Sequence, residues 1–360
     1  MPSKLFSSIS MRSLILENRI VISPMCQYAA TNGCPGDWHL MHLGQFAISG
    51  AGLLIIEMTN VEARGRISLH CMGLYNQDNE TALARVVDFC RQQSNTKIGI
   101  QLAHAGRKAS TLPPWQGRKP LHQNKGGWQT VSASAIANSG QSPLPTALTE
   151  IEIVQIIDAF AAAARRAQRI GIDAIELHGA HGYLLHQFLS PLSNHRKDDY
   201  GGSLQNRMRF PLEVFAAVRA AWPDDKPLGM RVSAIDWVEG GLTIEDTIEF
   251  GHELARLGCD WIDVSSGGLT ADEEITVGPG YQVPFAEQIK KQTGLTVIAI
   301  GMITGPHQAE AIIANGQSDL VALARGMLYD PRWTWHAATE LGVDIDYPVR
   351  YQRCKPLSHK

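Results

Sequence analysis

The feature that most constrains the fold is an alternation that recurs eight times along the chain. A short apolar run with strand character is followed each time by a longer amphipathic stretch with helical periodicity. Eight such units in order predict a closed (β/α)8 TIM barrel, an α/β fold. A doubly wound open sheet is the competing arrangement, but no G-x-G-x-x-G sequence follows the first strand. The expected strands cover residues 19–23, 53–57, 97–102, 174–177, 228–232, 261–265, 296–300 and 320–323, and the expected helices cover 39–49, 80–93, 150–170, 206–221, 244–257, 284–293, 307–315 and 333–341.

The length of the chain fits one barrel with insertions. Its 360 residues could hold two ordinary domains, but barrels of roughly 250 residues plus insertions form single domains, so we expect one domain over 1–360. Two connections exceed the usual loop length: 103–149, expected to cap the barrel, and 183–205. Both follow strands, which places them at the C-terminal face of the barrel. The tail, 344–360, has no helical period and is expected to form an arm.

Composition and charge exclude several classes of protein. The net charge of −3, from 32 basic and 35 acidic residues, argues against a nucleic-acid or anionic-membrane partner. No run approaches the roughly 18 apolar residues of a membrane span, and no signal-peptide core is present, so we expect a cytoplasmic protein. The six cysteines form no C-x2-C pair, which disfavours structural zinc or an iron–sulfur cluster and indicates free thiols.

Several residues at the expected strand ends indicate a ligand. Gly301 and Arg325 follow strands seven and eight, where barrels often bind phosphate, although a glycine turn and a salt-bridged arginine would look the same. The amide of Gln101 both donates and accepts, which suits the edge of a heterocycle. Arg231 lies in a strand of the barrel, so it needs either an anionic ligand or a core ion pair, for which Glu57 is a candidate.

The segment Glu176-Leu-His-Gly-Ala-His-Gly-Tyr183 places His178, His181 and Tyr183 at the end of strand four. These side chains could converge on one small group, because histidine and phenol both exchange protons and hydrogen bonds. H-x-x-H spacing also occurs among metal ligands, but no third ligand is evident. His39 and His42 share this spacing and are expected to serve the packing or capping of their helix.

Four motifs taken together resemble the Old Yellow Enzyme family of FMN-dependent ene-reductases. The similarity covers nearly the whole chain and is strongest to the bacterial, xenobiotic-reductase-like branch, also called thermophilic-like. The motifs are Pro24-Met-Cys-Gln-Tyr28, Gln101-Leu-x-His-Ala-Gly-Arg-Lys108, His178-Gly-Ala-His-Gly-Tyr-Leu184 and Asp199-Tyr-Gly-Gly-Ser-x-x-Asn-Arg-x-Arg-Phe210.

The resemblance implies an FMN-binding barrel that acts as an NAD(P)H-dependent flavin oxidoreductase, of the kind named NADPH dehydrogenase or ene-reductase. Its reductant is NADPH or NADH, and its substrates are small activated alkenes, the unsaturated carbonyl and nitro compounds. The positions that match the cofactor site are Ser23, Pro24, Met25 and Cys26 along the flavin, Met58 beneath the ring, Gln101 at the pyrimidine edge, Arg231 at the N1/O2 side, and Gly301, Ala324 and Arg325 at the phosphate.

The resemblance also implies roles for the residues that meet the substrate. His178 and His181 match the pair that binds the activating oxygen, so that hydride from flavin N5 reaches the β-carbon. Tyr183 matches the proton donor to the α-carbon, Tyr28 contacts substrate, and Cys26 tunes the redox potential. Ile300 replaces a tryptophan found in some relatives, so the pocket shape is expected to differ.

The C-terminal segment matches an arm that reaches a neighbouring subunit. Arg353 is the matching substrate-site residue, which implies a homodimer or homotetramer with exchanged arms, although a frayed tail is the simpler interpretation. Three other functions remain open. They are a metal-dependent barrel hydrolase that uses His178 and His181, a dienoyl-CoA-reductase-type flavoenzyme, and a non-catalytic flavin-binding or storage protein. The favoured interpretation requires no metal.

Overall fold

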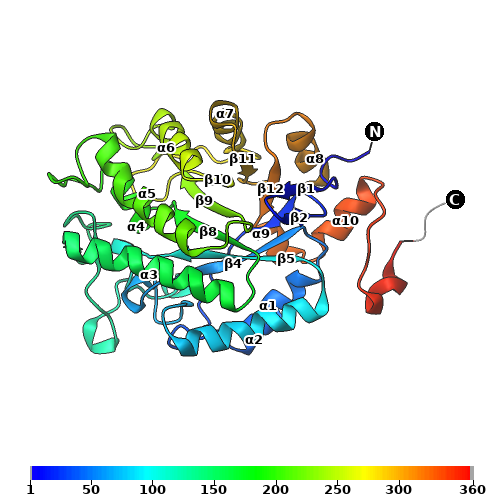
Figure 1. The fold of residues 1–360 in the computed structure, drawn as a ribbon, viewed down its shortest axis with the longest axis horizontal. Coiled ribbons are helices and arrows are strands. Elements are labelled where there is room, and N and C mark those ends of the chain that lie inside the picture. Colours follow the sequence, from blue (N-terminus) through cyan, green and yellow to red (C-terminus); the bar gives the residue numbers. More distant parts are fainter. Residues whose placement is uncertain (1, 357–360) are drawn as a thin grey trace.

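Eight parallel strands close into a barrel in a computed structural model that describes residues 2–356 (Figure 1). Neighbours in the barrel follow the order β10-β11-β12-β3-β4-β5-β8-β9, so every expected strand is present and the predicted (β/α)8 fold is confirmed. The barrel strands are β3 (Ile20–Ile22), β4 (Leu53–Asn60), β5 (Lys97–Ala103), β8 (Ala174–Gly179), β9 (Leu228–Ser233), β10 (Trp261–Ser265), β11 (Thr296–Ala299) and β12 (Leu320–Leu323).

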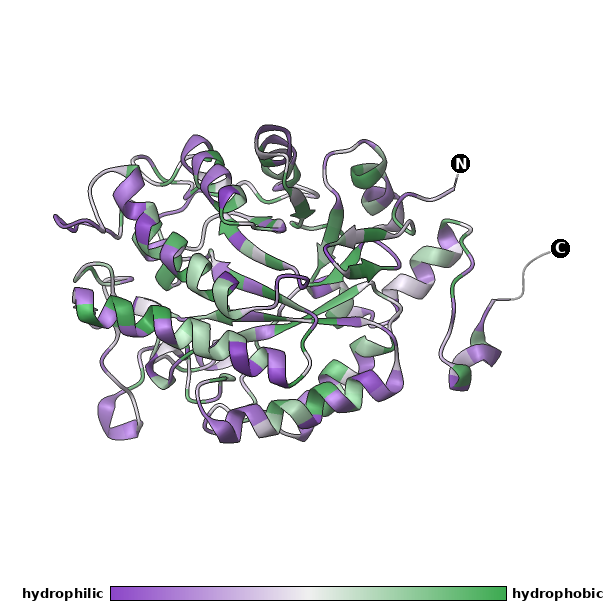
Figure 2. Ribbon diagram, in the orientation of Figure 1, coloured by the Kyte–Doolittle hydropathy of each residue, from purple (hydrophilic) through white to green (hydrophobic). Residues whose placement is uncertain are grey.

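The expected helices follow the strands and surround the barrel (Figure 1). Their starts are set by side-chain caps such as Thr149 with Glu152, and Thr243 with Asp246, which satisfy free backbone N–H groups. The surface helices alternate hydrophilic and hydrophobic residues, and their apolar sides pack on the strands (Figure 2). They are α1 (Asp37–Ala47), α2 (Gln77–Gln93), α3 (Glu150–Arg169), α5 (Leu204–Ala221), α6 (Ile244–Arg256), α7 (Val283–Thr293), α8 (Pro306–Ala314) and α10 (Trp333–Glu340).

An N-terminal hairpin that the sequence did not predict seals one end of the barrel. It pairs β1 (Ile9–Met11) with β2 (Leu14–Leu16) antiparallel. Its residue Leu16 shares a buried apolar cluster with the first residues of barrel strands, among them Leu53, Ala174 and Trp261. Because the hairpin fills the N-terminal end, the carboxyl ends of the strands are left for a site.

Gly229 is required by the packing inside this end of the barrel. It is paired in register with Trp261, and a Cβ atom at Gly229 would overlap the indole ring, which is fully buried. We expect Gly229→Ala to destabilise the protein by at least about 1–3 kcal/mol, because the core is overpacked. Thermal and denaturant unfolding would measure this, with Gly278→Ala as the control because a Cβ there meets nothing within 4 Å. Equal stability of the two variants would contradict the expectation.

The two long connections carry more structure than expected. Segment 103–149 forms the predicted cap, with three 3₁₀ turns, η2 (Gly106–Lys108), η3 (Pro114–Gln116) and η4 (Gln123–Lys125), and the short pair β6 (Val131–Ser132) and β7 (Thr146–Ala147). Within 183–205 the chain forms α4 (Leu184–Leu189), which was not predicted. All six residues of α4 are buried, including the polar His186 and Gln187, so the helix has no solvent-exposed side and leaves no amphipathic period. A further short helix, α9 (Arg325–Tyr329), follows strand β12.

The C-terminal arm leaves the barrel after α10 and contains a 3₁₀ turn, η5 (Val349–Cys354) (Figure 1). Tyr347 and Tyr351 pack on Trp335, with ring centroids 4.6 and 5.7 Å away. Tyr347 also lines a cavity of about 380 Å³ with Asn18 and Lys97, at the N-terminal end of the barrel. Among the residues that the structure describes, no helix is long and apolar enough to cross a bilayer.

Candidate active site

Strand β8 ends in a strained turn that brings three aromatic side chains together. His181 has φ +57°, a left-handed conformation that is rare for residues other than glycine, and Gly182 follows with φ +69°. The ring of His178 lies 5.1 Å from that of His181 and 4.8 Å from that of Tyr183, between centroids. The structure therefore gathers the three residues that the sequence proposed for catalysis, while their roles stay a prediction.

The hydrogen bonds of the two histidines leave one nitrogen of each ring available. Nδ1 of His178 accepts the N–H of Ala180 at 3.3 Å, so its proton is placed on Nε2. Nε2 of His181 lies 2.6 Å from the Ser265 hydroxyl. Burial, and after it the charge of Arg231, holds the pKa of both histidines well below its usual range. Both rings are therefore neutral at neutral pH.

Lys108 ties the loops around this turn together. Its Nζ donates to the carbonyl of His181 at 2.8 Å and to that of Gly268 at 2.7 Å, and it lies 5.4 Å from the centre of the Tyr183 ring. Burial lowers the pKa of Lys108 to about 8. Burial also raises the pKa of Tyr183 well above its usual value, so the phenol keeps its proton. The sequence motif contained Lys108, but no role was predicted for it.

A cavity of about 670 Å³, called here the strand-end cavity, opens beside the ends of β11 and β12. Gly301 has φ +109°, a backbone conformation that glycine adopts readily and other residues rarely do. Arg325 lines the cavity and its side chain is exposed. Ile300 lines this cavity too, where some relatives were expected to have tryptophan. Five predicted cofactor residues line it together: Ser23, Arg231, Gly301, Ala324 and Arg325.

Arg231 reaches the strand-end cavity from a buried group of charges inside the barrel. Its Nε lies 3.6 Å from Oδ2 of Asp263, and both side chains are almost fully buried. Glu176 lies in the same group and accepts from Nε2 of Gln101 at 2.8 Å and from Nε1 of Trp261 at 3.3 Å. Burial raises the pKa of both carboxyl groups. Glu176 and Asp263 are each a charged residue within an otherwise apolar strand, a sign of a buried charge for which no role was predicted.

Glu57 is not the partner of Arg231, which corrects the pairing considered from the sequence. Oε1 of Glu57 lies 3.3 Å from Nε2 of the buried His39, and Oε2 accepts the backbone N–H of Gln27 at 3.0 Å. A bulge in β4 between Ile56 and Thr59 turns this part of the strand aside, and the sequence pattern gives no sign of it. Glu57 instead fixes the segment that carries Cys26.

A second, smaller cavity of about 240 Å³ lies under the cap and is called the cap cavity. Tyr28 and Tyr183 both line it, and they pack with Cys26 against a small apolar cluster that contains Met58. Tyr28 has φ +52°, and its ring meets Trp115 of the cap edge-on at 5.7 Å. Pro24 and Met25 are half-buried in the same segment.

Two other predictions have mixed outcomes. His39 caps the start of α1 by accepting the N–H of Gly36 at 3.1 Å, and His42 packs edge-on against Phe46, so their expected structural roles are confirmed.

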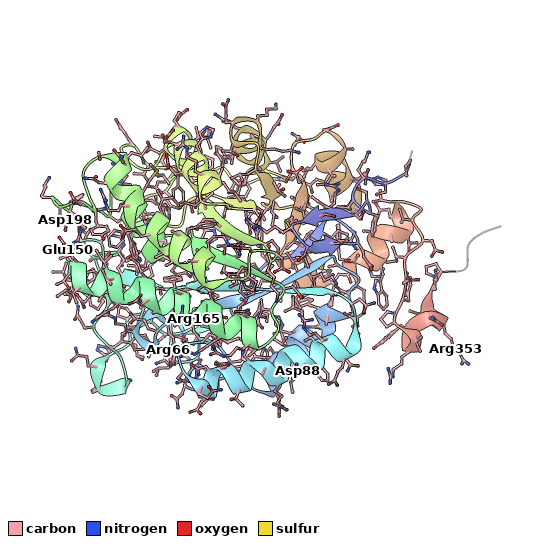
Figure 3. All side chains as sticks on the ribbon, in the orientation of Figure 1. Arg66, Asp88, Glu150, Arg165, Asp198 and Arg353 are labelled. Carbon is pink, nitrogen blue, oxygen red and sulfur yellow. The ribbon has the colours of Figure 1, made fainter. Side chains whose placement is uncertain are left out.

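Arg353 lies exposed on the arm, far from the strand ends of its own barrel (Figure 3). Within residues 2–356, no three His, Cys, Asp or Glu side chains gather as a metal site.

Comparison with known proteins identifies the family. The sequence profile of the NADH:flavin oxidoreductase / NADH oxidase family matches residues 4–343. This chain belongs to that family. The NADPH dehydrogenase of Geobacillus thermodenitrificans (strain NG80-2) is 44% identical over 355 residues, which cover 98% of this chain and 99% of the relative. The resemblance to the bacterial branch of the Old Yellow Enzyme family is therefore confirmed.

Solved structures of other proteins share the fold. Morphinone reductase superposes with a TM-score of 0.79 at 27% identity, over 97% of this chain and 92% of its own. A 2-naphthoyl-CoA reductase superposes with a TM-score of 0.85 at 24% identity, which shows a shared fold, and this chain spans 52% of that larger protein. The flavin oxidoreductase family thus accounts for the barrel fold and for FMN as the cofactor.

Proposed function

We propose that this family member is an ene-reductase that holds FMN in the strand-end cavity and receives an activated alkene in the cap cavity. The family establishes the enzyme class, an NAD(P)H-dependent flavin oxidoreductase with FMN. The chain fits that cofactor, because Arg325 supplies a cation for phosphate and Gly301 lets the backbone approach closely. Bound FMN supplies the hydride that reduces the alkene.

The observation that carries the proposal is the convergence of His178, His181 and Tyr183 at the end of β8. His178 presents an N–H at Nε2, because its Nδ1 accepts from the backbone. When the Ser265 hydroxyl donates to Nε2 of His181, the proton of that ring lies on Nδ1 and is free to donate. Two neutral N–H donors would bind the carbonyl or nitro oxygen of the alkene and stabilise the charge that develops there.

Tyr183 would deliver the proton that completes the reduction. Its hydroxyl stays protonated because burial raises its pKa, and its ring lies against His178. A proton on a weakly acidic phenol suits transfer to a strongly basic α-carbon. Tyr28, on the other side of the cap cavity, would contact the substrate, and Cys26 would lie along the flavin.

The purified protein provides the direct test. It should be yellow, with absorbance near about 450 nm from bound FMN, and should oxidise NADPH or NADH when 2-cyclohexenone is supplied. A colourless protein that does not take up FMN would overturn the proposal. A yellow protein that neither accepts electrons from a nicotinamide nor reduces any enone would instead indicate a flavin-binding or storage protein.

The alternative functions have less support. A hydrolase with His178 and His181 as metal ligands is not favoured, because within residues 2–356 no third His, Cys, Asp or Glu side chain gathers with them. A dienoyl-CoA-reductase-type enzyme is not favoured either, because the chain spans nearly the full length of an NADPH dehydrogenase and 52% of the naphthoyl-CoA reductase.

We extend the proposal to the assembly and location of the protein. The exposed Arg353 on a projecting arm suits a homodimer or homotetramer in which the arm of one subunit completes the site of another (Figure 3). Residues 1–360 would form one FMN-binding domain that works in the cytoplasm. Alkene and nicotinamide would bind in turn at the same face of the flavin.

A further inference from the structure

The cap cavity has a strongly cationic lining. Four of its lining residues carry a positive charge, and no lining residue is Asp or Glu. The four cations are Arg107, Lys108, Arg118 and Lys119. An apolar enone needs no such charge, so the lining indicates that part of the ligand is anionic.

Only part of this charge is used by the protein itself. Arg107 donates to the carbonyl of Leu269 at 3.0 Å, and Lys108 donates to two carbonyls, so both fix the loops around the site. The side chains of Arg118 and Lys119 make no hydrogen bond or ion pair with any residue in the described range, 2–356. These two cations are therefore free to meet a ligand.

The backbone of the cap holds Arg118 at the mouth of the cavity. Turn η3 is followed by Gly117 with φ +85° and Arg118 with φ +53°, two consecutive left-handed residues. The N–H of Arg118 donates to the carbonyl of Pro113 at 3.4 Å, and the carbonyl of Lys119 accepts from Leu112 at 2.8 Å. A non-glycine residue in this conformation costs stability, so its placement needs a reason beyond the turn.

The positive charge of Arg118 influences the pKa values of both tyrosines that line the cap cavity. Burial is the main cause that raises the pKa of Tyr183, and the positive charge of Arg118 acts in the opposite direction. The same opposition holds for Tyr28, whose pKa burial raises, and Arg118 also contributes to the lowered pKa of Lys108 after burial. The guanidinium thus lies within electrostatic range of both tyrosines that line the cap cavity.

We propose that Arg118, assisted by Lys119, is a specificity residue that binds an anionic group on the ligands of this site. This rests on the proposed ene-reductase function. The group is a carboxylate or a phosphate, and it has two sources: an acidic substituent of the alkene, or the 2′-phosphate that distinguishes NADPH from NADH. The exchange of ligands in one site lets the same cation serve both.

The test compares matched ligands on the FMN-loaded protein. 4-Hydroxybenzoate and its neutral analogue 4-hydroxybenzamide are titrated, and the dissociation constant is read from the change in flavin absorbance. Arg118→Gln should weaken the binding of 4-hydroxybenzoate by roughly 10- to 100-fold, as for the loss of a charged hydrogen bond, and should leave the binding of 4-hydroxybenzamide within about twofold. In a second arm, the rate of flavin reduction by NADPH and by NADH is measured at limiting nicotinamide.

The two arms distinguish the sources. If Arg118→Gln weakens only 4-hydroxybenzoate binding, Arg118 binds an acidic group of the alkene. If it slows only flavin reduction by NADPH, Arg118 binds the 2′-phosphate of the nicotinamide. Lys125→Gln is the matched control, because Lys125 is an exposed cation of the cap that does not line the cavity. Arg118→Glu should enlarge whichever loss is seen.

The inference fails if Arg118→Gln changes neither anionic ligand, or if the neutral and anionic ligands weaken equally. Failure of the underlying function would look different. The unmodified protein would then give no flavin response to the neutral analogue and no reduction by either nicotinamide.

Discussion

Replacing His178 with alanine should lower the rate of enone reduction by roughly 100- to 1000-fold while FMN stays bound. The ring of His178 faces His181 and Tyr183, and its Nε2 is the nitrogen left free by the backbone hydrogen bond. The variant loses one of two donors that would stabilise the developing charge on the substrate oxygen. The reduction rate with 2-cyclohexenone and the dissociation constant of a phenolic ligand are the measurements, and both should worsen.

Two further variants separate a catalytic role of His178 from a structural one. His181→Ala should show a loss of similar size, because its ring provides the second donor. His122→Ala should behave as the unmodified protein, since His122 is exposed on the cap. If His178→Ala loses FMN, or if the flavin content stays full and turnover is unchanged, then His178 does not have the proposed role.

The stability of the protein should fall between pH 5 and pH 8 because of the buried acids under Arg231, and Glu176→Gln should reduce that fall. Burial, and after it the charge of Asp263, raises the pKa of Glu176 from 4.5 to about 8. The folded protein therefore keeps a proton that the unfolded chain releases near pH 4.5. This contribution is complete below pH 4.5 and is lost as the pH rises through about 8.

The glutamine variant cannot ionise at this position. Its melting temperature should therefore fall between pH 5 and pH 8 by roughly 3–6 °C less than that of the unmodified protein. The groups that face Glu176 are Asp263, Arg231, Gln101 and Trp261, so one carboxylate remains to pair with the arginine. Glu239→Gln serves as the control because Glu239 is exposed. Identical pH profiles for Glu176→Gln and the unmodified protein would rule out the buried pair as the cause.

Sequence patterns predicted the elements that repeat and the residues at the ends of strands. The eight helices were foreseen because each buries one side and leaves a period of 3.6 residues, and the eight strands because strands buried on both sides leave short continuous apolar runs. Helix α4 was missed because all its residues are buried, and the N-terminal hairpin because its short strands gave no clear pattern. The predicted cofactor positions Ser23, Arg231 and Gly301 line one cavity because parallel strands bring their carboxyl ends to the same face.

The sequence alone determined the class of fold, the family and the identity of the residues at the strand ends, since these follow from local periodicity and short motifs. The tertiary structure decided which residues meet. It paired Arg231 with Asp263 rather than Glu57, turned His181 toward Ser265, and brought Arg118 into the lining of the cap cavity together with the two tyrosines. These contacts join residues that are far apart in the chain, and they depend on barrel closure, the bulge in β4 and the fold of the cap. No local pattern encodes the distance between such partners, because that distance is fixed only when the strands close around a shared core.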